Sequence, residues 1–405
     1  MPVVSLRAQN IPASPIRRLT PLADATASRG VHVHRLNIGQ PDVHTPRAMI
    51  EAYQTYDEPV LAYGPSLGIP ALREAAAADY ARHGSAVDAS DVIVTTGGSE
   101  AIRFSLCAVA DPGDEVLVFE PFYANYLGFA AEYGVHLRAV SSSIDSGFHL
   151  PDIETIEAAI TERTKAILVT SPGNPTGAIY SSEEMSRLGE VALRHDLFLI
   201  SDEAYREFAY DGVKVTSALT LDQVLDRVIV VDSVSKRYSA CGARIGFFVS
   251  KNPEVHQAAM RMAFARLCPA TVDQRAALAA FATPQTYFDE VVAEYTRRRD
   301  VLVDGLRQIE GVQTYTPEGA FYTMATFPVD DVDRFAAWLL TDFSLDGETV
   351  MLAPASGFYS TPGLGTKEAR IAYVLECEAL RRAALCLAAA IPRYLESGRG
   401  ALPRA

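Results

Sequence analysis

The stretch that best indicates the fold is VDSVSKRYSACGARIG, residues 231–246. It begins at the end of an apolar run, residues 228–231, which predicts a buried strand. Lys236 follows shortly after, and loss of hydration beside a buried strand favours the neutral, nucleophilic amine. Nearby side chains could hold an anion such as a phosphate: Ser233, Ser235 and Arg244. A surface loop with a solvated lysine explains the same residues, so this stretch alone leaves two interpretations open.

The composition is typical of a folded globular protein. The 405 residues are 49% hydrophobic and 21% charged, and so long a chain predicts two or three domains. The formal net charge of −14 argues against nucleic acid or an anionic membrane as a main partner. The five cysteines lack CxxC spacing and the eight histidines lack HExxH spacing, which argues against a disulfide scaffold and against a metal centre.

The chain shows no sequence signal for export or for membrane insertion. The first ten residues contain no apolar core of a signal peptide. No apolar stretch approaches the roughly 20 residues that span a bilayer. Cysteines without a disulfide pattern are typical of a reducing compartment. We therefore expect a cytoplasmic protein with no membrane partner.

From about residue 91 onward, apolar runs that predict strands alternate with helical patterns. We expect strands at about 91–96, 115–120, 165–170, 197–201, 227–232 and 245–249, and helices at about 99–110 and 181–196. The strands are near-continuous apolar runs, which indicates a mostly parallel central sheet covered by helices on both faces. The sequence therefore predicts an α/β fold.

A long amphipathic helix at about 286–308 is expected to link this sheet to a smaller α+β domain. The expected elements of that domain are strands at about 321–327, 351–354 and 369–374 and helices near 332–342 and 376–395. The predicted domains are an N-terminal arm that also contributes to the small domain at 1–45, a large domain at 46–285, and the linking helix with the small C-terminal domain at 286–405. The run Arg297-Arg298-Arg299 predicts a solvated face of the linking helix.

Three loops follow predicted strands at their carboxyl ends, where ligands of open α/β sheets bind. The first, TTGGSEAI at residues 95–102, places Gly98 and Ser99 at a helix start whose backbone N–H groups could bind a phosphate. The second, SPGNPTG at residues 171–177, offers the amide of Asn174. A tight turn capped by Ser99 and an Asn-Pro turn are the simple alternatives for these two loops.

The third loop reads SDEAY, residues 201–205. Asp202 could pair with a protonated heterocyclic nitrogen, and Tyr205 could donate to an oxyanion. A helix N-cap with a first-turn acid is the simple alternative for residues 202–203. Three such loops and a lysine, each at the end of a predicted parallel strand, are difficult to produce by chance.

In combination these motifs resemble those of the class I/II aminotransferases, which belong to the fold-type-I pyridoxal phosphate family. The shared motifs are NPTG, D-x-A-Y, S-x-S-K and an arginine eight positions after the lysine, and the resemblance extends from about residue 37 to about residue 374. The lysine stretch is similar to that of the aspartate-aminotransferase-like branch. The resemblance implies transfer of the amino group of an L-amino acid, with aspartate as a candidate donor, to a 2-oxo acid such as 2-oxoglutarate by a ping-pong mechanism.

The same resemblance assigns roles to individual residues around the cofactor, pyridoxal 5′-phosphate. Lys236 is implied to bond the cofactor and to move the proton at the substrate Cα, and Asp202 to pair with the pyridine nitrogen. Tyr205 and Asn174 are implied to donate to the 3′-oxygen, and Tyr123 to stack on the ring. The residues implied to hold the phosphate are Gly98, Ser99, Ser233, Ser235 and Arg244.

The family pattern also implies how the substrate and a second subunit take part. Arg370 would bind the α-carboxylate of the substrate, for which a planar guanidinium is suited, and the backbone of Gly39 would approach the same carboxylate. Tyr63 would reach the phosphate of the neighbouring subunit. The resemblance therefore implies a homodimer with shared active sites.

Several alternatives stay open at the level of the sequence. The same cofactor could support elimination, cyclisation or oxidation of an amino acid, or the chain could be a sensor that binds pyridoxal phosphate without turnover. Arg237 could face solvent or make a structural contact, which is the favoured interpretation, or it could reach a partner subunit or a second substrate carboxylate. Arg103 could meet an acidic substrate side chain, although a salt bridge within the protein is favoured.

Overall fold

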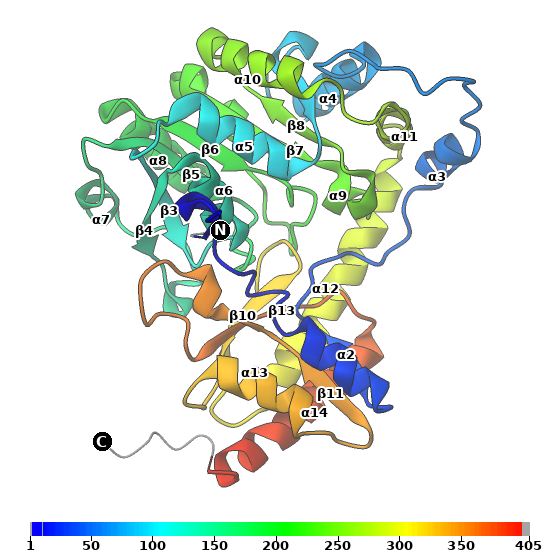
Figure 1. The fold of residues 1–405 in the computed structure, drawn as a ribbon, viewed down its shortest axis with the longest axis vertical. Coiled ribbons are helices and arrows are strands. Elements are labelled where there is room, and N and C mark those ends of the chain that lie inside the picture. Colours follow the sequence, from blue (N-terminus) through cyan, green and yellow to red (C-terminus); the bar gives the residue numbers. More distant parts are fainter. Residues whose placement is uncertain (1, 10, 399–405) are drawn as a thin grey trace.

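The structure is a computed structural model that describes residues 2–9 and 11–398. Its larger part is built on a seven-stranded sheet with the order β2-β8-β7-β6-β5-β3-β4 (Figure 1). The strands are β2 Val92–Thr95, β3 Glu115–Glu120, β4 His136–Ser141, β5 Thr164–Thr170, β6 Phe198–Asp202, β7 Val228–Ser233 and β8 Gly246–Val249. All neighbouring pairs are parallel except the two that include β8, so the predicted mostly parallel sheet is confirmed.

Strand β8 is antiparallel to both of its neighbours, β2 and β7. The chain turns directly from β7 into β8 through residues 234–245, which contain only the one-turn helix α9 Val234–Arg237 and a short 3₁₀ turn. A parallel neighbour would require a crossover that carries the chain back along the sheet. The stretch that contains Lys236 is therefore a connection at one end of the sheet.

Helices cover both faces of this sheet. The helices on one face are α4 Pro70–Arg82, α8 Ser182–Arg194 and α11 Thr271–Ala280, and those on the other are α5 Gly98–Val109, α6 Asn125–Tyr133 and α10 Pro253–Arg266. Successive residues of one strand enter different cores, since Val230 packs with the first set and Val231 with the second, and both are fully buried. Burial on both faces explains why the strands are continuously apolar.

The smaller part of the molecule has its own sheet, β12-β13-β10-β9, in which all pairs are antiparallel. Its strands are β9 Gln313–Thr314, β10 Tyr322–Thr326, β12 Ala353–Pro354 and β13 Glu368–Ala372. A parallel pair, β1 His32–Arg35 with β11 Glu348–Met351, joins the N-terminal segment to this part. The helices here are α2 Thr20–Ser28, α13 Val332–Thr341 and α14 Cys377–Glu396. The predicted strand at 351–354 is thus two strands, because the chain changes partner from β1 to β13 after Met351.

The long helix α12 Gln285–Arg307 runs from the larger part into the smaller one (Figure 1). The remaining helices are α1 Leu6–Gln9, α3 Arg47–Gln54 and α7 Ile153–Ala158. Across residues 2–9 and 11–398, no helix combines the length and the apolar character that a membrane crossing requires. The division at residues 45 and 285 stays a prediction, and its outermost residues, Met1 and 399–405, lie outside the described residues.

The predicted solvated face of α12 is wrong for two of its three arginines. Arg298 and Arg299 are only 5% and 3% exposed. Arg298 pairs with Asp42 at 2.6 Å, and Arg299 pairs with Asp211 at 2.7 Å. The helix is packed along more than one side, so a run of three arginines on it cannot all reach solvent.

A buried carboxylate, Glu120 at the end of β3, ties the larger sheet to a loop of the smaller part. Its Oε2 accepts hydrogen bonds from the backbone N–H groups of Ser360 and Thr361, at 2.8 Å and 3.1 Å, and its Oε1 accepts one from Ser141 Oγ at 2.8 Å. Although burial opposes ionisation of Glu120, these hydrogen bonds lower its pKa below the ordinary value. The charged side chain therefore fixes the loop at residues 358–361.

Removing this carboxylate should destabilise the protein, because two backbone N–H groups and a hydroxyl would lose a buried, charged acceptor. We expect Glu120→Ala to lower the free energy of unfolding by roughly 3 kcal/mol, measured by urea denaturation. The matched control is Glu132→Ala, which removes a half-exposed pair with Arg103, and should cost about 1 kcal/mol or less. Equal losses in the two variants would contradict the role given to Glu120.

Candidate active site

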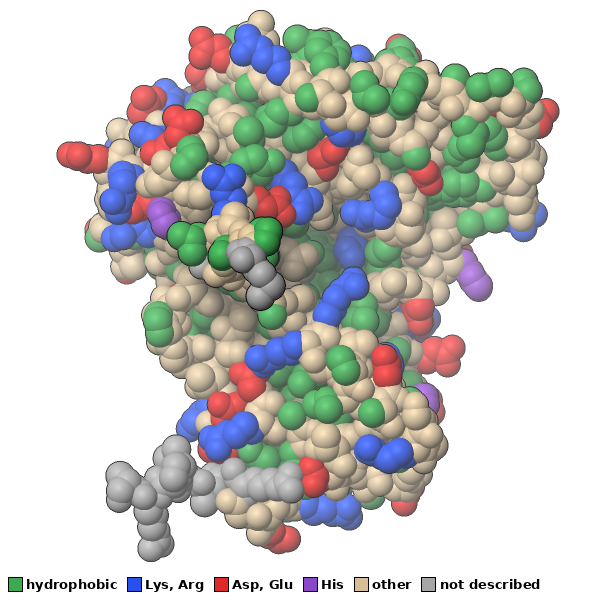
Figure 2. Space-filling view, viewed as in Figure 1, with side chains coloured by type: hydrophobic (Ala, Val, Ile, Leu, Met, Phe, Trp, Pro, Cys, Tyr) green, Lys and Arg blue, Asp and Glu red, His purple; other side chains and the backbone are tan. Residues whose placement is uncertain are grey.

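A cavity of about 590 Å³ lies where the carboxyl ends of the parallel strands face the smaller part. Figure 2 shows a hollow between the upper and lower parts of the molecule, with Lys and Arg side chains at its rim. Every predicted site residue except Tyr63 lines the cavity: Gly39, Gly98, Ser99, Tyr123, Asn174, Asp202, Tyr205, Ser233, Ser235, Lys236, Arg244 and Arg370. Residues from segments far apart in the chain are thus gathered around one space.

Lys236 lies in the one-turn helix α9 and reaches into this cavity. Its Nζ donates a hydrogen bond to the carbonyl oxygen of Gly39 at 2.9 Å and lies 3.7 Å from Cys241 Sγ. The same nitrogen is 5.9 Å from the ring centres of Tyr205 and Phe321. The amine is therefore held at the junction of the two parts, against the backbone of the segment predicted to approach the substrate.

Asp202 ends strand β6 and is nearly buried. Its Oδ2 accepts a hydrogen bond from Tyr126 Oη at 2.6 Å, and its Oδ1 accepts one from the backbone N–H of Ala204 at 3.2 Å. Burial raises the pKa of Asp202 to about 6, and the charge of Asp232 adds to this rise. A carboxylate kept in this environment is stabilised by any cation that enters the cavity beside it.

An anion cradle forms where α5 begins, next to the β7–β8 connection. Gly97 has a φ of +76°, no described side chain caps the helix start, and the first two helical residues, Gly98 and Ser99, line the cavity. Uncapped N–H groups at a helix start suit an anion. A Cβ on Gly97 would overlap the guanidinium of Arg244, which itself has a φ of +53°, a region that non-glycine residues seldom adopt. Ser233 Oγ and Ser235 Oγ lie 2.8 Å apart beside this guanidinium.

Arg370 enters the cavity from strand β13 and is 1% exposed. Its Nη1 donates to Asn174 Oδ1 at 3.0 Å, and its Nη2 donates to the backbone oxygen of Asn37. Its Nε is buried without a hydrogen-bond partner among the described residues. Since a buried guanidinium with an unfilled donor is costly, the arrangement favours an external acceptor such as a carboxylate.

Tyr322, on strand β10, belongs to the site but was not predicted. Its Oη is 2.9 Å from Tyr205 Oη, and Tyr205 Oη is 3.4 Å from Asn174 Nδ2. A Cβ on Gly39 would overlap the ring of Tyr322, so only glycine fits there. The sequence offered little indication of this role, because a tyrosine in an apolar strand is typical of a buried core residue. Its strand, β10, pairs with β13, which carries Arg370, and this pairing brings Tyr322 to the site.

Three predicted or open residues remain outside the cavity. Tyr63 is 84% exposed, and it does not reach the site of its own chain. Arg103 pairs with Glu132, with Nε to Oε2 at 2.5 Å, as favoured from the sequence. Arg237 makes a structural contact, but it is 2% exposed, so the prediction that it could face solvent is wrong.

Pyridoxal phosphate suits the groups that line this cavity. The anion cradle matches the phosphate, and the buried carboxylate of Asp202 matches a protonated ring nitrogen. Lys236 supplies the amine, and Tyr123, which is wedged against Tyr126 with ring centres 5.4 Å apart, supplies an aromatic surface at the same cavity. In the described part of the chain no cluster of His, Cys, Asp and Glu suits a metal ion.

The raised pKa of Asp202 predicts a pH-dependent cost in the cofactor-free protein. Between pH 3.8 and about 6 the folded state binds more protons than the unfolded state, so stability falls as pH rises through this range. At pH 8 the cost is at most about 3 kcal/mol. We expect cofactor-free Asp202→Asn to be more stable than the wild type at pH 8, with roughly half of that advantage remaining at pH 5. Urea denaturation at both values checks this, and an advantage independent of pH would contradict it.

Comparison with known proteins agrees with this geometry. A family model, aminotransferase class I and II, matches residues 31–384. The probable aspartate/prephenate aminotransferase of Aquifex aeolicus is 32% identical over 379 residues, 92% of this chain and 95% of the relative. The solved structure of the aspartate aminotransferase of Thermus thermophilus with maleate aligns with a TM-score of 0.87 at 31% sequence identity. The solved structure of the alanine aminotransferase of Pyrococcus furiosus aligns with a TM-score of 0.88 at 33% identity. Each alignment covers 96% of this chain and 100% of the other chain. The chain belongs to the class I and II aminotransferases and is a pyridoxal-phosphate-dependent aminotransferase.

Proposed function

We propose that this aminotransferase moves the amino group of L-aspartate to 2-oxoglutarate by a ping-pong mechanism, with Lys236 as the catalytic residue. The observation that carries the proposal is the pair of Lys236 and Arg370 in one cavity. Arg370 is buried with an unfilled Nε donor, which a substrate α-carboxylate would satisfy. The carbonyl oxygen of Gly39 lies 2.9 Å from Lys236 Nζ. The amine is therefore next to the Gly39 segment, whose backbone is expected to approach the substrate α-carboxylate.

The residues that would hold the cofactor are those of the anion cradle, with Asp202, Tyr205, Asn174 and Tyr123. When bound, pyridoxal phosphate supplies an electron sink for the substrate Cα. Asp202 would keep the ring nitrogen protonated, and its hydrogen bond from Tyr126 orients its carboxylate toward the cavity. Lys236 would take the proton from the substrate Cα and return it, because its amine lines the cavity and lies 2.9 Å from the carbonyl oxygen of Gly39, beside the proposed carboxylate site.

A second carboxylate on the substrate is supported by Arg17, which lines the cavity near its mouth. Its positive charge favours a dicarboxylic amino acid over alanine. The relatives bear names with different donors, since one is an aspartate/prephenate and another an alanine aminotransferase. The solved structure with maleate holds a dicarboxylate. Aspartate is therefore the donor we favour.

A homodimer is the proposed assembly. Tyr63 is 84% exposed, and neighbouring apolar side chains are also exposed, with Val60 at 69% and Leu61 at 74%. Exposed apolar residues gathered on one loop indicate a surface that another chain covers. Tyr63 would then contribute to the phosphate site of the partner, as the family resemblance implies.

The separate seven-stranded and four-stranded sheets support the proposed division into a large domain at 46–285 and a small domain at 286–405, and the β1–β11 pair supports placing the arm at 1–45 with the small domain. The five cysteines are free, which suits a reducing cytoplasm, the proposed location.

The function is tested by following glutamate formation from aspartate and 2-oxoglutarate. The wild-type protein should be yellow, bleach on borohydride reduction and form glutamate, whereas Lys236→Ala should lose all three properties. Arg17→Gln should raise the KM for aspartate at least tenfold and leave the KM for alanine unchanged. An active Lys236→Ala would overturn the catalytic assignment. Consumption of aspartate without a new amino acid would show elimination or oxidation instead.

The proposed assembly is tested by mass and by hybrid dimers. Light scattering should give twice the chain mass of 43.8 kDa. Mixing Lys236→Ala chains with Tyr63→Ala chains, by unfolding and refolding together, should create one site with both residues intact. Activity at limiting pyridoxal phosphate should then exceed that of either parent. No gain on mixing would argue that each site is complete within one chain.

A further inference from the structure

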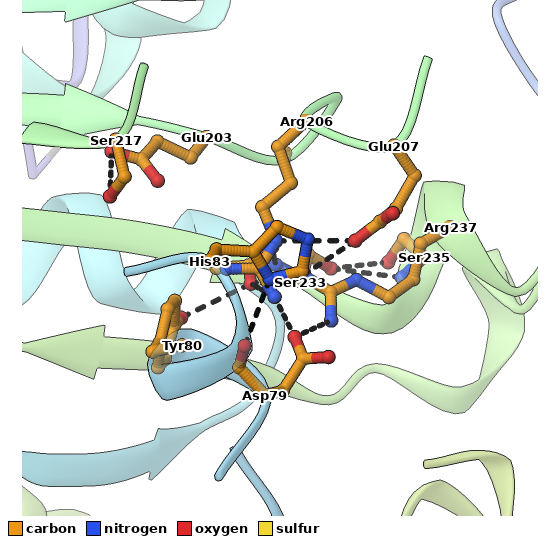
Figure 3. Close-up of polar contacts among 12 residues, drawn as sticks. Asp79, Tyr80, His83, Glu203, Arg206, Glu207, Ser217, Ser233, Ser235 and Arg237 are labelled. Atoms are coloured by element: carbon orange, nitrogen blue, oxygen red, sulfur yellow. Dashed lines mark hydrogen bonds and ion pairs between the residues drawn. The ribbon is translucent and has the colours of Figure 1, made fainter. Parts of the chain in front are cut away.

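A cluster of buried charges lies on the side of the Lys236 stretch that faces away from the cavity. Arg237 is its centre, and its Nη2 donates to Asp232 Oδ2 at 2.6 Å. Its Nη1 donates to Asp79 Oδ2 at 2.8 Å (Figure 3). Arg206 pairs with the same oxygen of Asp79 and lies 4.6 Å over the ring of Tyr80. The exposed fractions of Asp79, Asp232 and Arg237 are 4%, 1% and 2%.

The cluster is connected by hydrogen bonds to the anion cradle. Asp232 Oδ1 accepts a hydrogen bond from the backbone N–H of Ser233 at 2.6 Å. Ser233 Oγ then donates to Ser235 Oγ at 2.8 Å and accepts a hydrogen bond from the backbone N–H of Ser235 at 3.1 Å. A continuous path therefore leads from Asp79 in α4, through Arg237 and Asp232, to the two hydroxyls predicted to bind the phosphate.

Arg237 remains charged in this environment. Burial alone would lower its pKa, but the carboxylates of Asp232 and Glu207 outweigh burial and raise the pKa above its ordinary value. The cluster contains three carboxylates, Asp79, Asp232 and Glu207, and two arginines. Removal of either arginine would leave a single guanidinium to compensate all three carboxylates. The charge of Asp232 also contributes to the raised pKa of Asp202. The cluster therefore influences Asp202 electrostatically, in addition to its hydrogen-bonded connection to the two serines.

The position of Arg237 gives the cluster a geometric effect. Helix α9 has only four residues, too few to hold its own orientation. Lys236 enters the cavity from it, and the next residue, Arg237, is anchored to α4 and to β7. Replacing a buried ion pair by apolar residues is often neutral for stability, so the geometry that the pair specifies accounts for its presence better than added stability does.

We propose that Arg237 is a positioning residue: by bridging Asp79 and Asp232 it orients α9 so that Lys236, Ser233 and Ser235 are presented together to pyridoxal phosphate. The inference rests on the proposed roles of Lys236 and of the two serines. It assigns to Arg237 no contact with the substrate or the cofactor.

The test measures the affinity of the cofactor-free protein for pyridoxal phosphate, well below the melting temperature. Arg237→Met should weaken binding at least tenfold, and Asp79→Asn should weaken it in the same direction. Arg237→Lys, which keeps the charge but not the two-armed bridge, should recover part of the loss. The matched control is Arg299→Met, since Arg299 is 3% exposed, pairs with Asp211 and Asp300, and does not line the cavity.

The control separates positioning from simple stability. Arg299→Met should lower the melting temperature as Arg237→Met does, but should change cofactor affinity less than twofold. Wild-type affinity in Arg237→Met would overturn the proposal. If Arg237→Met does not fold, Arg237→Lys and Asp79→Asn carry the same comparison, and wild-type affinity in both overturns it. A wild-type protein that fails to bind the cofactor through Lys236 would instead refute the proposed function.

Discussion

The parallel hydrogen-bonded ladder through β5, β6 and β7 is the constraint on which the site depends. Its register pairs Thr170 with Asp202 and Asp202 with Val231, so the three strands end at nearly the same level. The loop that carries Asn174, the carboxylate of Asp202 and the stretch that carries Lys236 must then emerge at one edge. A shift of one residue in any strand would turn its side chains to the opposite face and separate these groups.

Several carboxylates are buried near this end of the sheet, and burying a charge is unfavourable. The fold stabilises these carboxylates in two different ways. Asp79 and Asp232 form ion pairs with Arg206 and Arg237 of the same chain, so their charges are compensated within the protein. Asp202 has hydrogen-bond donors but no cation at bonding distance among the residues that the structure describes, and burial raises its pKa to about 6. Ion pairs within the chain fix local geometry, whereas a buried carboxylate that lacks a cation favours binding of a cationic ligand.

The sequence predicted the groups that local motifs carry, and it missed those that distant segments bring together. Asp202, Asn174 and Lys236 each follow an apolar run within a few residues, so the strand pattern located them and the parallel sheet brought them together. Arg237 was visible, but its partner Asp79 lies 158 residues away in the sequence. Tyr322 resembles a core residue in the sequence because it lines the cavity and also packs in the hydrophobic core of the smaller part. The antiparallel direction of β8 was likewise invisible, since an apolar run does not encode its direction.

Within residues 2–9 and 11–398, five arginines are buried, and the chemistry of their partners divides them into two groups. Arg206, Arg237, Arg298 and Arg299 each pair with at least one carboxylate of the same chain. Arg370, as buried as any of them, has only an amide oxygen, a backbone oxygen and the faces of Tyr322 and Phe358 as neighbours among the described contacts. A guanidinium desolvated without an anion is unfavourable unless an anion arrives. The same residue type at the same burial therefore supports two different proposals: Arg237, paired with carboxylates of its own chain, as a positioning residue, and Arg370 as the residue that binds the substrate carboxylate.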